Sequence, residues 1–402
     1  MSWYGYTAIL MLVVQLFFLL QMLRNYRYAI KKYKKVRSTF YPKTALIIPC
    51  KGLDAAFEKN LSSFFLQDYK PFTLLLVVEN SSDPAYEVLC KLQKKYTGQC
   101  KAAEVKVLVA GEALKSSQKV YNLLYAYKQI PDDTEVAAFA DSDVCVGRDW
   151  LCQLVYPLRK ERHGVASGYR WFVPQRNNLA TLALSAINAK VAQLLGPNIF
   201  GLAWGGSMAI RVETCQRINL EKLWCSSISD DLSVSYAVKK AGLKIIFVPA
   251  CLVASYVSTT WRDFFEFARR QFVITRVVIP RTWCIGLESS LYSVFGLWGM
   301  GAIAIGGWLK GSQEWGLPAV VSLVFFGGHV WRSSLRQIMI ARILKDDVRR
   351  MRWAAAADIL GSWLFSLVLL FIILSSAASR TISWRGIRYR LVSSTETVIE
   401  QR

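Results

Sequence analysis

The sequence predicts an α/β domain, with a mostly parallel sheet covered by helices, between N-terminal and C-terminal transmembrane helices. Two observations predict this fold class. Between residues 38 and 260, short and almost continuously apolar runs alternate with helical patterns, which is typical of a parallel sheet buried on both faces. Outside that region the chain is strongly apolar, so that 53% of all 402 residues are hydrophobic and the mean hydropathy is +0.26. These values favour a membrane protein over an ordinary soluble one.

The first element is an apolar run over residues 7–23, close to the shortest helix that spans a bilayer. A cleaved signal peptide is the alternative interpretation. However, the basic cluster follows the run instead of preceding it, and no small-residue cleavage site comes next. We therefore expect an uncleaved anchor with its N-terminus outside, so that the next domain faces the cytosol. The basic cluster consists of Arg24, Arg27, Lys31, Lys32, Lys34, Lys35 and Arg37.

The central domain is expected to alternate strands and helices. Strands are predicted at Thr44–Pro49, Phe72–Val78, Val105–Val109, Glu135–Ala140, Val165–Tyr169, Ser207–Arg211 and Lys244–Val248. Helices are predicted near residues 55–66, 84–96, 118–129, 148–160, 178–195 and 231–241. Ligands of such sheets bind beyond the carboxyl ends of the strands. No GxGxxG follows the first strand and no GxxxxGK[ST] occurs, which disfavours dinucleotide and P-loop sites.

Several segments follow this domain. Residues 261–281 combine an apolar face with arginines, which suits a helix in the membrane interface; an amphipathic helix packed on the soluble core is the alternative. Residues 285–309 and 317–331 are expected to pair, and residues 354–378 form the clearest C-terminal span. Four full crossings would put the basic tail outside, against the positive-inside trend, so a re-entrant or interfacial segment is one expectation and the number of spans stays open. The predicted divisions are 1–37 (anchor and basic flank), 38–260 (cytosolic domain), 261–283 (interfacial helix), 284–379 (C-terminal transmembrane region) and 380–402 (basic tail).

The formal net charge of +22 does not indicate nucleic acid as a partner. Many basic residues flank hydrophobic spans, where they are typical of cytoplasmic segments and attract anionic lipid headgroups. The nine cysteines are scattered without a CxxC pair and there are only two histidines. A zinc site is therefore not expected, and a reducing compartment is favoured.

The sequence EVAAFADSDVCV carries the first candidate site. An apolar strand runs directly into Asp141 and Asp143, and two carboxylates so spaced at a strand end can hold a divalent cation with a diphosphate. An isolated Asp-x-Asp is usually a solvated turn, but the position after a buried strand favours the metal site. The expected cofactor is Mg or Mn.

A second acidic pair, Asp230 and Asp231, opens a helical run after serine-rich residues. One of these aspartates could simply cap the helix by accepting hydrogen bonds from free N–H groups. That explanation accounts for one carboxylate better than for two. The functional interpretation is a general base that deprotonates an acceptor hydroxyl.

The motifs ALIIPCKGLD, FFLQDYKPFTLLLVVENSSDPA, LQKKY and QKVYNL precede Asp141-Ser142-Asp143 in this order, and WGGSMAIR and SDDLSVSYAVKKAGLKI follow. In this order and spacing they resemble the ceramide glucosyltransferases and their bacterial lipid-glucosylating relatives, within the inverting GT-A glycosyltransferase family 2 superfamily. The resemblance covers residues 40–280. It implies a GT-A nucleotide-diphospho-sugar transferase domain. It also implies inverting transfer of a hexose, expected to be glucose, from a UDP-sugar to a ceramide-like or terpenoid lipid hydroxyl.

The resemblance also implies roles for individual residues. The nucleotide pocket would be lined by Pro49, Lys51 and Gly52, while Glu79 and Asp83 would recognise the uracil–ribose end. Simpler explanations exist: Gly52 could have no role beyond permitting a turn, and Asp83 could have no role beyond starting a helix.

Further implied roles concern the reacting groups. Lys119 would counter the diphosphate charge, although an exposed helix lysine is the alternative. Asp141 and Asp143 would hold the metal, Asp231 would be the base with Asp230 beside it, and Gly205 and Gly206 would let the backbone approach the acceptor.

One motif departs from the superfamily. Where a [Gln/Arg]-x-x-Arg-Trp element is expected, this chain reads FARRQFVITR, which offers Arg269 and Arg270 to the donor and Gln271 and Phe272 to the acceptor side. The departure mildly disfavours a processive polysaccharide synthase. A polysaccharide or polyprenyl-phosphate glycosyltransferase and a catalytically degenerate membrane scaffold remain the alternatives. A transporter is disfavoured, because charged residues are sparse inside the spans.

Overall fold

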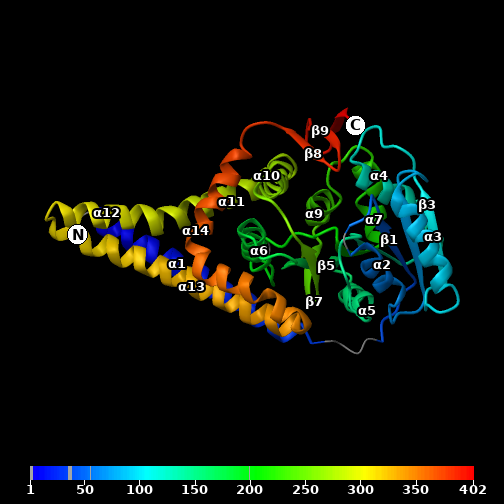
Figure 1. The fold of residues 1–402 in the computed structure, drawn as a ribbon, viewed down its shortest axis with the longest axis horizontal. Helices are drawn as coiled ribbons and strands as arrows, with labels where there is room; N and C mark the ends of the chain where they lie inside the picture. Colours follow the sequence, from blue (N-terminus) through cyan, green and yellow to red (C-terminus); the bar gives the residue numbers. More distant parts are fainter. Residues whose placement is uncertain (1–2, 35–38, 55, 199) are drawn as a thin grey trace.

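The computed structural model describes residues 3–34, 39–54, 56–198 and 200–402 (Figure 1). An α/β domain occupies one end of the molecule, and long helices extend from it at the other. The predicted boundary between residues 37 and 38, together with Lys35 and Arg37, lies outside the described residues.

Within the described residues, seven strands form one sheet in the order β3-β2-β1-β4-β6-β5-β7. Strands β1 to β4 pair in parallel, as do β5 and β7, whereas β6 is antiparallel to β4 and β5. The prediction of an α/β domain with a mostly parallel sheet is confirmed. The strands are β1 (Thr44–Pro49), β2 (Phe72–Val78), β3 (Glu104–Val109), β4 (Val136–Ala140), β5 (His163–Pro174), β6 (Ser207–Arg211) and β7 (Lys244–Val257).

Strands β5 and β7 are longer than their apolar runs predict. Each continues beyond its predicted end, and the two pair along the added length, from Tyr169 opposite Leu252 to Pro174 opposite Val257. Arg170 interrupts the apolar run of β5, and Pro249 interrupts that of β7, so the sequence pattern does not predict the added length. Backbone hydrogen bonds between the two strands stabilise this added length, which the composition alone does not predict.

Helices cover both faces of the sheet because successive strand residues point to opposite sides. In β1, Leu46 and Ile48 belong to a core shared with α2, α3 and α5, whereas Ile47 belongs to a core shared with α4 and α9. The helices of this domain are α2 (Phe57–Phe65), α3 (Pro84–Tyr96), α4 (Gln118–Tyr127), α5 (Trp150–Val155), α6 (Leu179–Ala192), α7 (Val212–Arg217), α8 (Leu220–Trp224) and α9 (Asp230–Lys240). Polar N-cap side chains begin several of them, namely Asp83, Ser117, Asn178 and Ser229.

Three helical stretches of the described chain are long and apolar enough to cross a membrane: Gly5–Lys32, Pro280–Leu309 and Lys345–Ser375. In Figure 1, α1, α12 and α13 lie along one another as an arm that extends from the domain. In contrast, α14 crosses the base of the arm and packs against α6 and α13. The helices are α1 (Trp3–Lys32), α10 (Trp261–Val278), α11 (Pro280–Val294), α12 (Met300–Leu309), α13 (Gly316–Ile343) and α14 (Val348–Ser375), with a π-helical segment (Phe295–Gly299) between α11 and α12.

A buried polar network attaches α14 to its neighbours. The Arg336 guanidinium of α13 donates to Asp358 of α14, with 2.6 Å between Nε and Oδ2, and to Gln193 after α6, with 3.0 Å between Nη1 and Oε1. Arg336 and Asp358 are almost completely buried. Paired buried charges fix register between helices, so α14 is held against protein along this part of its length.

The predicted basic tail is a folded unit. It forms β8 (Thr381–Trp384), β9 (Ile387–Leu391) and β10 (Thr397–Gln401), which pair antiparallel. In β9, alternate residues are buried and exposed, so the arginines point outward and Ile387, Tyr389 and Leu391 point inward. They pack with Ile382 against α10, and the sheet lies beside α4, α9 and α10 in Figure 1. Tail and domain therefore lie on one side of any membrane that the helices cross.

Helix α10 carries the region that was expected in the membrane interface. It packs against α6, α9, α14 and β8. Phe264 and Ala268 are buried with α6 and α14, whereas Trp261 is exposed. Protein thus covers most of its apolar face, as in the alternative interpretation, and its position at a membrane surface stays a prediction.

Candidate functional site

The carboxyl edge of the sheet gathers most of the predicted site residues. Lys51, Glu79 and Asp141 follow the ends of β1, β2 and β4, which are parallel neighbours. The antiparallel β6 begins at this edge, which brings Gly205 and Gly206 to the same place. The sheet topology thus explains why residues distant in sequence meet here.

Lys119 joins the two acidic pairs. Its Nζ lies 2.7 Å from Oδ1 of Asp141 and 3.2 Å from Oδ2 of Asp230. Burial acts to lower the pKa of Lys119, but the carboxylates of Asp141, Asp230 and Asp231 raise it overall. The lysine is therefore a buried cation and not the exposed helix lysine of the alternative. Its contact with a diphosphate stays a prediction, since two carboxylates now share its charge.

Asp143 points away from Lys119. Its Oδ2 lies 3.3 Å from Nη1 of Arg170, and its buried Oδ1 has no hydrogen-bond partner among the described residues. A carboxylate oxygen left without a donor suits a divalent cation. No cluster of three or more His, Cys, Asp or Glu side chains in the described chain could hold a metal alone. The site therefore fits Mg or Mn only where substrate phosphate or water completes the coordination.

The second acidic pair lies at the start of α9, but neither aspartate is the N-cap. The Ser229 hydroxyl has that role and accepts from the Leu232 N–H at 3.2 Å. Asp230 is 3% exposed, and burial raises its pKa to about 6. Its Oδ2 contacts Lys119 only as an ion pair, without hydrogen-bond geometry. The pair therefore needs an explanation other than helix capping.

Asp231 is held in one orientation by three donors. Oδ1 accepts from the Ser229 hydroxyl at 2.6 Å and from the Leu232 N–H at 2.7 Å, and Oδ2 accepts from the Gly205 N–H at 3.1 Å. Unlike Asp230, this residue is only partly buried. It therefore combines a fixed geometry with partial exposure.

Gly205 and Gly206 are required by close packing against carboxylates. A Cβ atom on Gly205 would lie 1.8 Å from Oδ2 of Asp230, and one on Gly206 would lie 2.6 Å from Oδ2 of Asp141 and closer still to Trp204. Both glycines thus make room for the two aspartates that bind Lys119. Their predicted contact with an acceptor is not tested by this packing.

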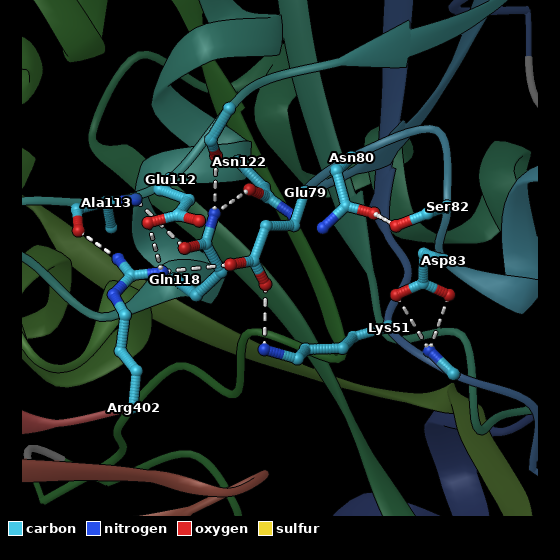
Figure 2. A network of polar contacts seen from close by, with 12 residues as sticks. Lys51, Glu79, Asn80, Ser82, Asp83, Glu112, Ala113, Gln118, Asn122 and Arg402 are labelled. Carbon is cyan, nitrogen blue, oxygen red and sulfur yellow. Dashed lines mark hydrogen bonds and ion pairs between the residues drawn. The ribbon is translucent and has the colours of Figure 1, made fainter.

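The residues that are predicted to bind the nucleoside part of the donor belong to a network of charged groups (Figure 2). Glu79 is nearly buried, and its Oε2 lies 2.7 Å from Nζ of Lys51. Its Oε1 accepts from Nη1 of Arg402 at 2.9 Å, and Arg402 also pairs with Glu112 at 3.3 Å and donates to the Ala113 carbonyl. Lys51 and Glu79 therefore lie together, and their contacts with a nucleotide stay predictions. Arg402 was not anticipated.

Asp83 joins the loop after β1 to helix α3. Its carboxylate accepts from the Gly52 N–H at 2.9 and 3.2 Å and from the Ala85 N–H at 2.9 Å (Figure 2). Asp83 does start a helix, and Gly52 has a positive φ of 67°. Pro49 ends β1 opposite Val77 of β2. Their contacts with a nucleotide stay predictions.

Gln118 fixes the loop after β3 to the start of α4. Its side chain donates to the Gly111 carbonyl at 2.9 Å and to Asn122 at 2.8 Å, and accepts from the Ala113 N–H at 2.9 Å (Figure 2). The backbone N–H of Gln118 donates to the hydroxyl of Tyr389 in the C-terminal sheet at 3.2 Å. The tail therefore touches the residue next to Lys119.

The two arginines of α10 have different surroundings. Arg269 donates to the carbonyls of Ser375 and Ala378 at the end of α14, at 3.1 and 3.2 Å. Arg270 lies over the rings of Phe267 and Trp384, at 5.5 and 5.4 Å from their centroids. Burial lowers the pKa of Arg270 to about 10, and nearby Arg170 adds to this shift. Arg270, rather than Arg269, therefore lies near Arg170, the partner of Asp143.

Gln271 and Phe272 lie outside this group. Gln271 is exposed, and Phe272 packs in the apolar cluster between α6, α10 and α14. The aromatic rings that face arginines here are instead those of Phe267 and Trp384, next to Arg270, and that of Trp204, next to Arg170. The predicted acceptor roles of Gln271 and Phe272 gain no support from these contacts.

Arg170 lies next to Asp143, and none of the sequence motifs indicated it. It lies on β5, pairs with Asp143, and sits 5.0 Å from the ring centroid of Trp204. The available signal was a lone arginine within an apolar run that continues as WFVP. A charge inside a buried strand needs a partner, which points to a site.

Comparison with known proteins identifies a family for this chain. The model of the family described as Glycosyl transferase family 21 matches residues 6–397. Ceramide glucosyltransferase 1 from Caenorhabditis elegans is 36% identical over 87 residues, and ceramide glucosyltransferase 3 from the same organism is 32% identical over 87 residues. Each alignment spans 22% of this chain and 18% of the relative.

Among solved structures, the chain is similar to the mannosyltransferase PcManGT from Pyrobaculum calidifontis, determined with GDP-Man and Mn²⁺. The identity is 13%, the TM-score is 0.45, and the match covers 92% of this chain and 96% of the other. The family assignment rests on the sequence match along nearly the whole chain, and not on this likeness. The chain belongs to glycosyl transferase family 21.

Proposed function

We propose that this protein is a membrane-bound inverting glycosyltransferase that moves a hexose, expected to be glucose, from a UDP-sugar to a lipid hydroxyl. One observation carries the proposal: Lys119 joins two acidic pairs from distant segments at the carboxyl edge of the sheet. Membership of glycosyl transferase family 21 and local similarity to ceramide glucosyltransferases support the sugar and lipid classes. A ceramide-like or terpenoid lipid is the expected acceptor.

In the proposed reaction, Asp231 is the general base. It takes the proton from the acceptor hydroxyl as that oxygen attacks the anomeric carbon, and the bond from that carbon to the UDP oxygen breaks. Three hydrogen bonds orient its carboxylate before the acceptor arrives, which lowers the entropy cost of reaching the transition state. Because there is a single displacement, the anomeric configuration inverts.

Asp230 and Lys119 have a positioning role in this proposal. Asp230 is too buried to meet a substrate, and it shares the Lys119 ammonium with Asp141. The lysine thus fixes Asp141 beside the diphosphate position. Arg270 is close to Arg170, the partner of Asp143, and its charge there would favour departing UDP.

Mg or Mn would be held by Asp143 and Asp141, with phosphate oxygens of the donor completing the coordination. When bound, such a cation would neutralise charge on the diphosphate. The support for it in this chain is the buried Oδ1 of Asp143, which has no donor among the described residues.

The membrane arrangement follows from the tail. Since residues 380–402 pack on the α/β domain, the helices between them cross an even number of times, if they cross at all. The arm formed by α12 and α13 supplies one such outward and return path. With basic residues flanking α1, we propose that the domain and tail lie on the cytoplasmic face, next to the acceptor lipid.

The proposal is tested by incubating membranes that contain the protein with a panel of UDP-sugars and analysing lipids by mass spectrometry. A single hexose on a sphingoid or terpenoid lipid is expected, and Asp231→Asn membranes provide the control. A ladder of sugars or a polyprenyl product would identify one of the alternative glycosyltransferases. No UDP release from any donor would identify a scaffold instead of an enzyme.

A further inference from the structure

The C-terminal sheet brings one residue to the proposed donor site from the far end of the chain. Strands β8 and β9 are joined by Arg385 and Gly386, and both have a positive φ, 51° and 84°. A two-residue turn with this geometry matches the twist of a β-hairpin and favours Asn, Asp or Gly at the first position. Arginine is an unfavourable choice there, so the turn itself does not explain it.

The surroundings of Arg385 lie within the site. Its Nη2 is 3.1 and 3.2 Å from the two carboxylate oxygens of Asp54, in the loop after β1. The preceding residue, Trp384, has Arg270 over its ring. Arg385 is also close enough to Asp141 and Arg270 to help lower the pKa of each group.

The ion pair with Asp54 is a weak reason for placing arginine here. Both side chains are accessible to solvent, 48% for Arg385 and 30% for Asp54, and exposed pairs contribute little to stability. The pair therefore does little to offset the unfavourable backbone of Arg385. A ligand contact is a stronger reason, since strained residues concentrate where function demands a fixed direction.

Like charges accumulate around the hairpin tip. Arg170 and Arg385 both act on Arg270 to lower its pKa, so guanidinium groups from β5 and from the tail both lie close to the one on α10. Asp54 and Asp143 balance part of this charge. An arriving diphosphate would supply the remaining negative charge and accept hydrogen bonds in the geometry that guanidinium groups prefer.

We propose that Arg385 is a donor-binding residue: the β8–β9 hairpin places its guanidinium at the diphosphate of the sugar nucleotide. This inference rests on the proposed function, because it assigns a residue to the same donor site. It makes residues 380–402 part of the site and not merely a basic segment near a membrane.

The test uses the full chain in detergent and measures the affinities for UDP and for uridine. Arg385→Asn keeps a residue that accepts a positive φ, so the hairpin should form as before. We expect UDP binding to weaken roughly 10- to 100-fold, the loss of one hydrogen bond to a charged group, while uridine binding stays unchanged. Thermal unfolding of the variant should match that of the unmodified chain.

The matched control is Arg388→Asn. Arg388 is exposed on β9 and pairs with Glu400, so its loss removes the same charge from the same sheet, away from the cleft. UDP affinity equal in the two variants would overturn the assignment, and so would a parallel loss of uridine binding in Arg385→Asn, which indicates a structural role. If the unmodified chain binds neither UDP nor uridine, the proposed function fails and this inference fails with it. If Arg385→Asn weakens UDP binding but the unmodified chain transfers no sugar, Arg385 remains a donor-binding residue and only the proposed transfer reaction is rejected.

Discussion

The two acidic pairs of the site differ in origin but are arranged alike. One pair follows a buried strand and the other opens a helix, yet in each pair one carboxylate contacts Lys119 and the other is partly exposed. Asp141 and Asp230 are the inner members, and Asp143 and Asp231 are the outer ones. The comparison teaches that spacing alone does not assign roles, because burial and hydrogen-bond donors divide each pair.

The outer members retain unused capacity to bind. Asp143 has an oxygen without a donor among the described residues, and Asp231 is partly exposed with its orientation fixed. The inner members instead keep a buried lysine charged. If this division is right, outer substitutions should change chemistry and binding alone, whereas inner substitutions should also change stability.

The largest expected effect belongs to Asp231→Asn. Losing the base should slow transfer by roughly 10²- to 10⁴-fold, the usual contribution of general-base catalysis. UDP affinity should stay unchanged, since the donor does not depend on this carboxylate. The measurements are initial rates of glycolipid formation and UDP binding. Normal turnover would remove Asp231 as the base and break the comparison.

Asp143→Asn should weaken metal-dependent donor binding. The amide cannot replace a charged ligand, so Mn²⁺-dependent UDP affinity should fall at least about 10-fold, as even outer-shell substitutions at metal sites cause. Binding measured with Mn²⁺ and with EDTA separates the metal from direct contacts. An identical Mn²⁺ effect in the variant and the unmodified chain would contradict a metal role. Asp141→Ala should likewise weaken UDP binding, but it also frees Lys119 and is a less clean test.

Gly205→Ala tests the packing behind the inner members. The added Cβ would meet Asp230 at 1.8 Å, so the backbone must move, at a cost of about 1–3 kcal/mol in unfolding free energy. The melting temperature should fall. Gly286→Ala is the control, because a Cβ there meets nothing within 4 Å. Equal melting temperatures for both variants would show that Asp230 is not tightly confined.

The smallest effect is a pH dependence from Asp230. Burial raises its pKa in the folded protein to about 6, from the ordinary value of 3.8 that applies to an unfolded chain. Between these values only the folded state keeps the proton, so this contribution is complete below pH 3.8 and is lost as pH rises through about 6. The stability of the unmodified chain relative to Asp230→Asn should therefore decline from pH 4 to pH 7. A constant difference would contradict the raised pKa.

Most of the fold was predictable, because the strands of the domain are apolar and follow each other in a regular order. The ends of β5 and β7 were not, since Arg170 and Pro249 interrupt their apolar runs and the added length is held by pairing between the strands. The tail was missed for a related reason. Its arginines give it the composition of a basic tail, although Ile387, Tyr389 and Leu391 alternate with them in the pattern of a strand.

The site was predictable where residues follow strand ends, as with Lys51, Glu79 and Asp141. Spacing did not show which member of each acidic pair is buried, because that depends on where Lys119 enters from α4. Contacts across long sequence distances, such as Arg385 with Asp54 and Arg402 with Glu79, leave no local pattern. Such contacts require the folded chain.

The docking of β8–β10 on the α/β domain has a consequence for biosynthesis. During translation α1 and then the sheet of the domain emerge first, the C-terminal apolar helices follow, and the strands that touch Gln118 and Asp54 come after them. A nascent chain with a finished domain would still lack Arg385 and Tyr389 while those helices are made. The order of synthesis thereby delays a complete site until the C-terminal helices have been made, which would restrict sugar consumption to chains that already contain them.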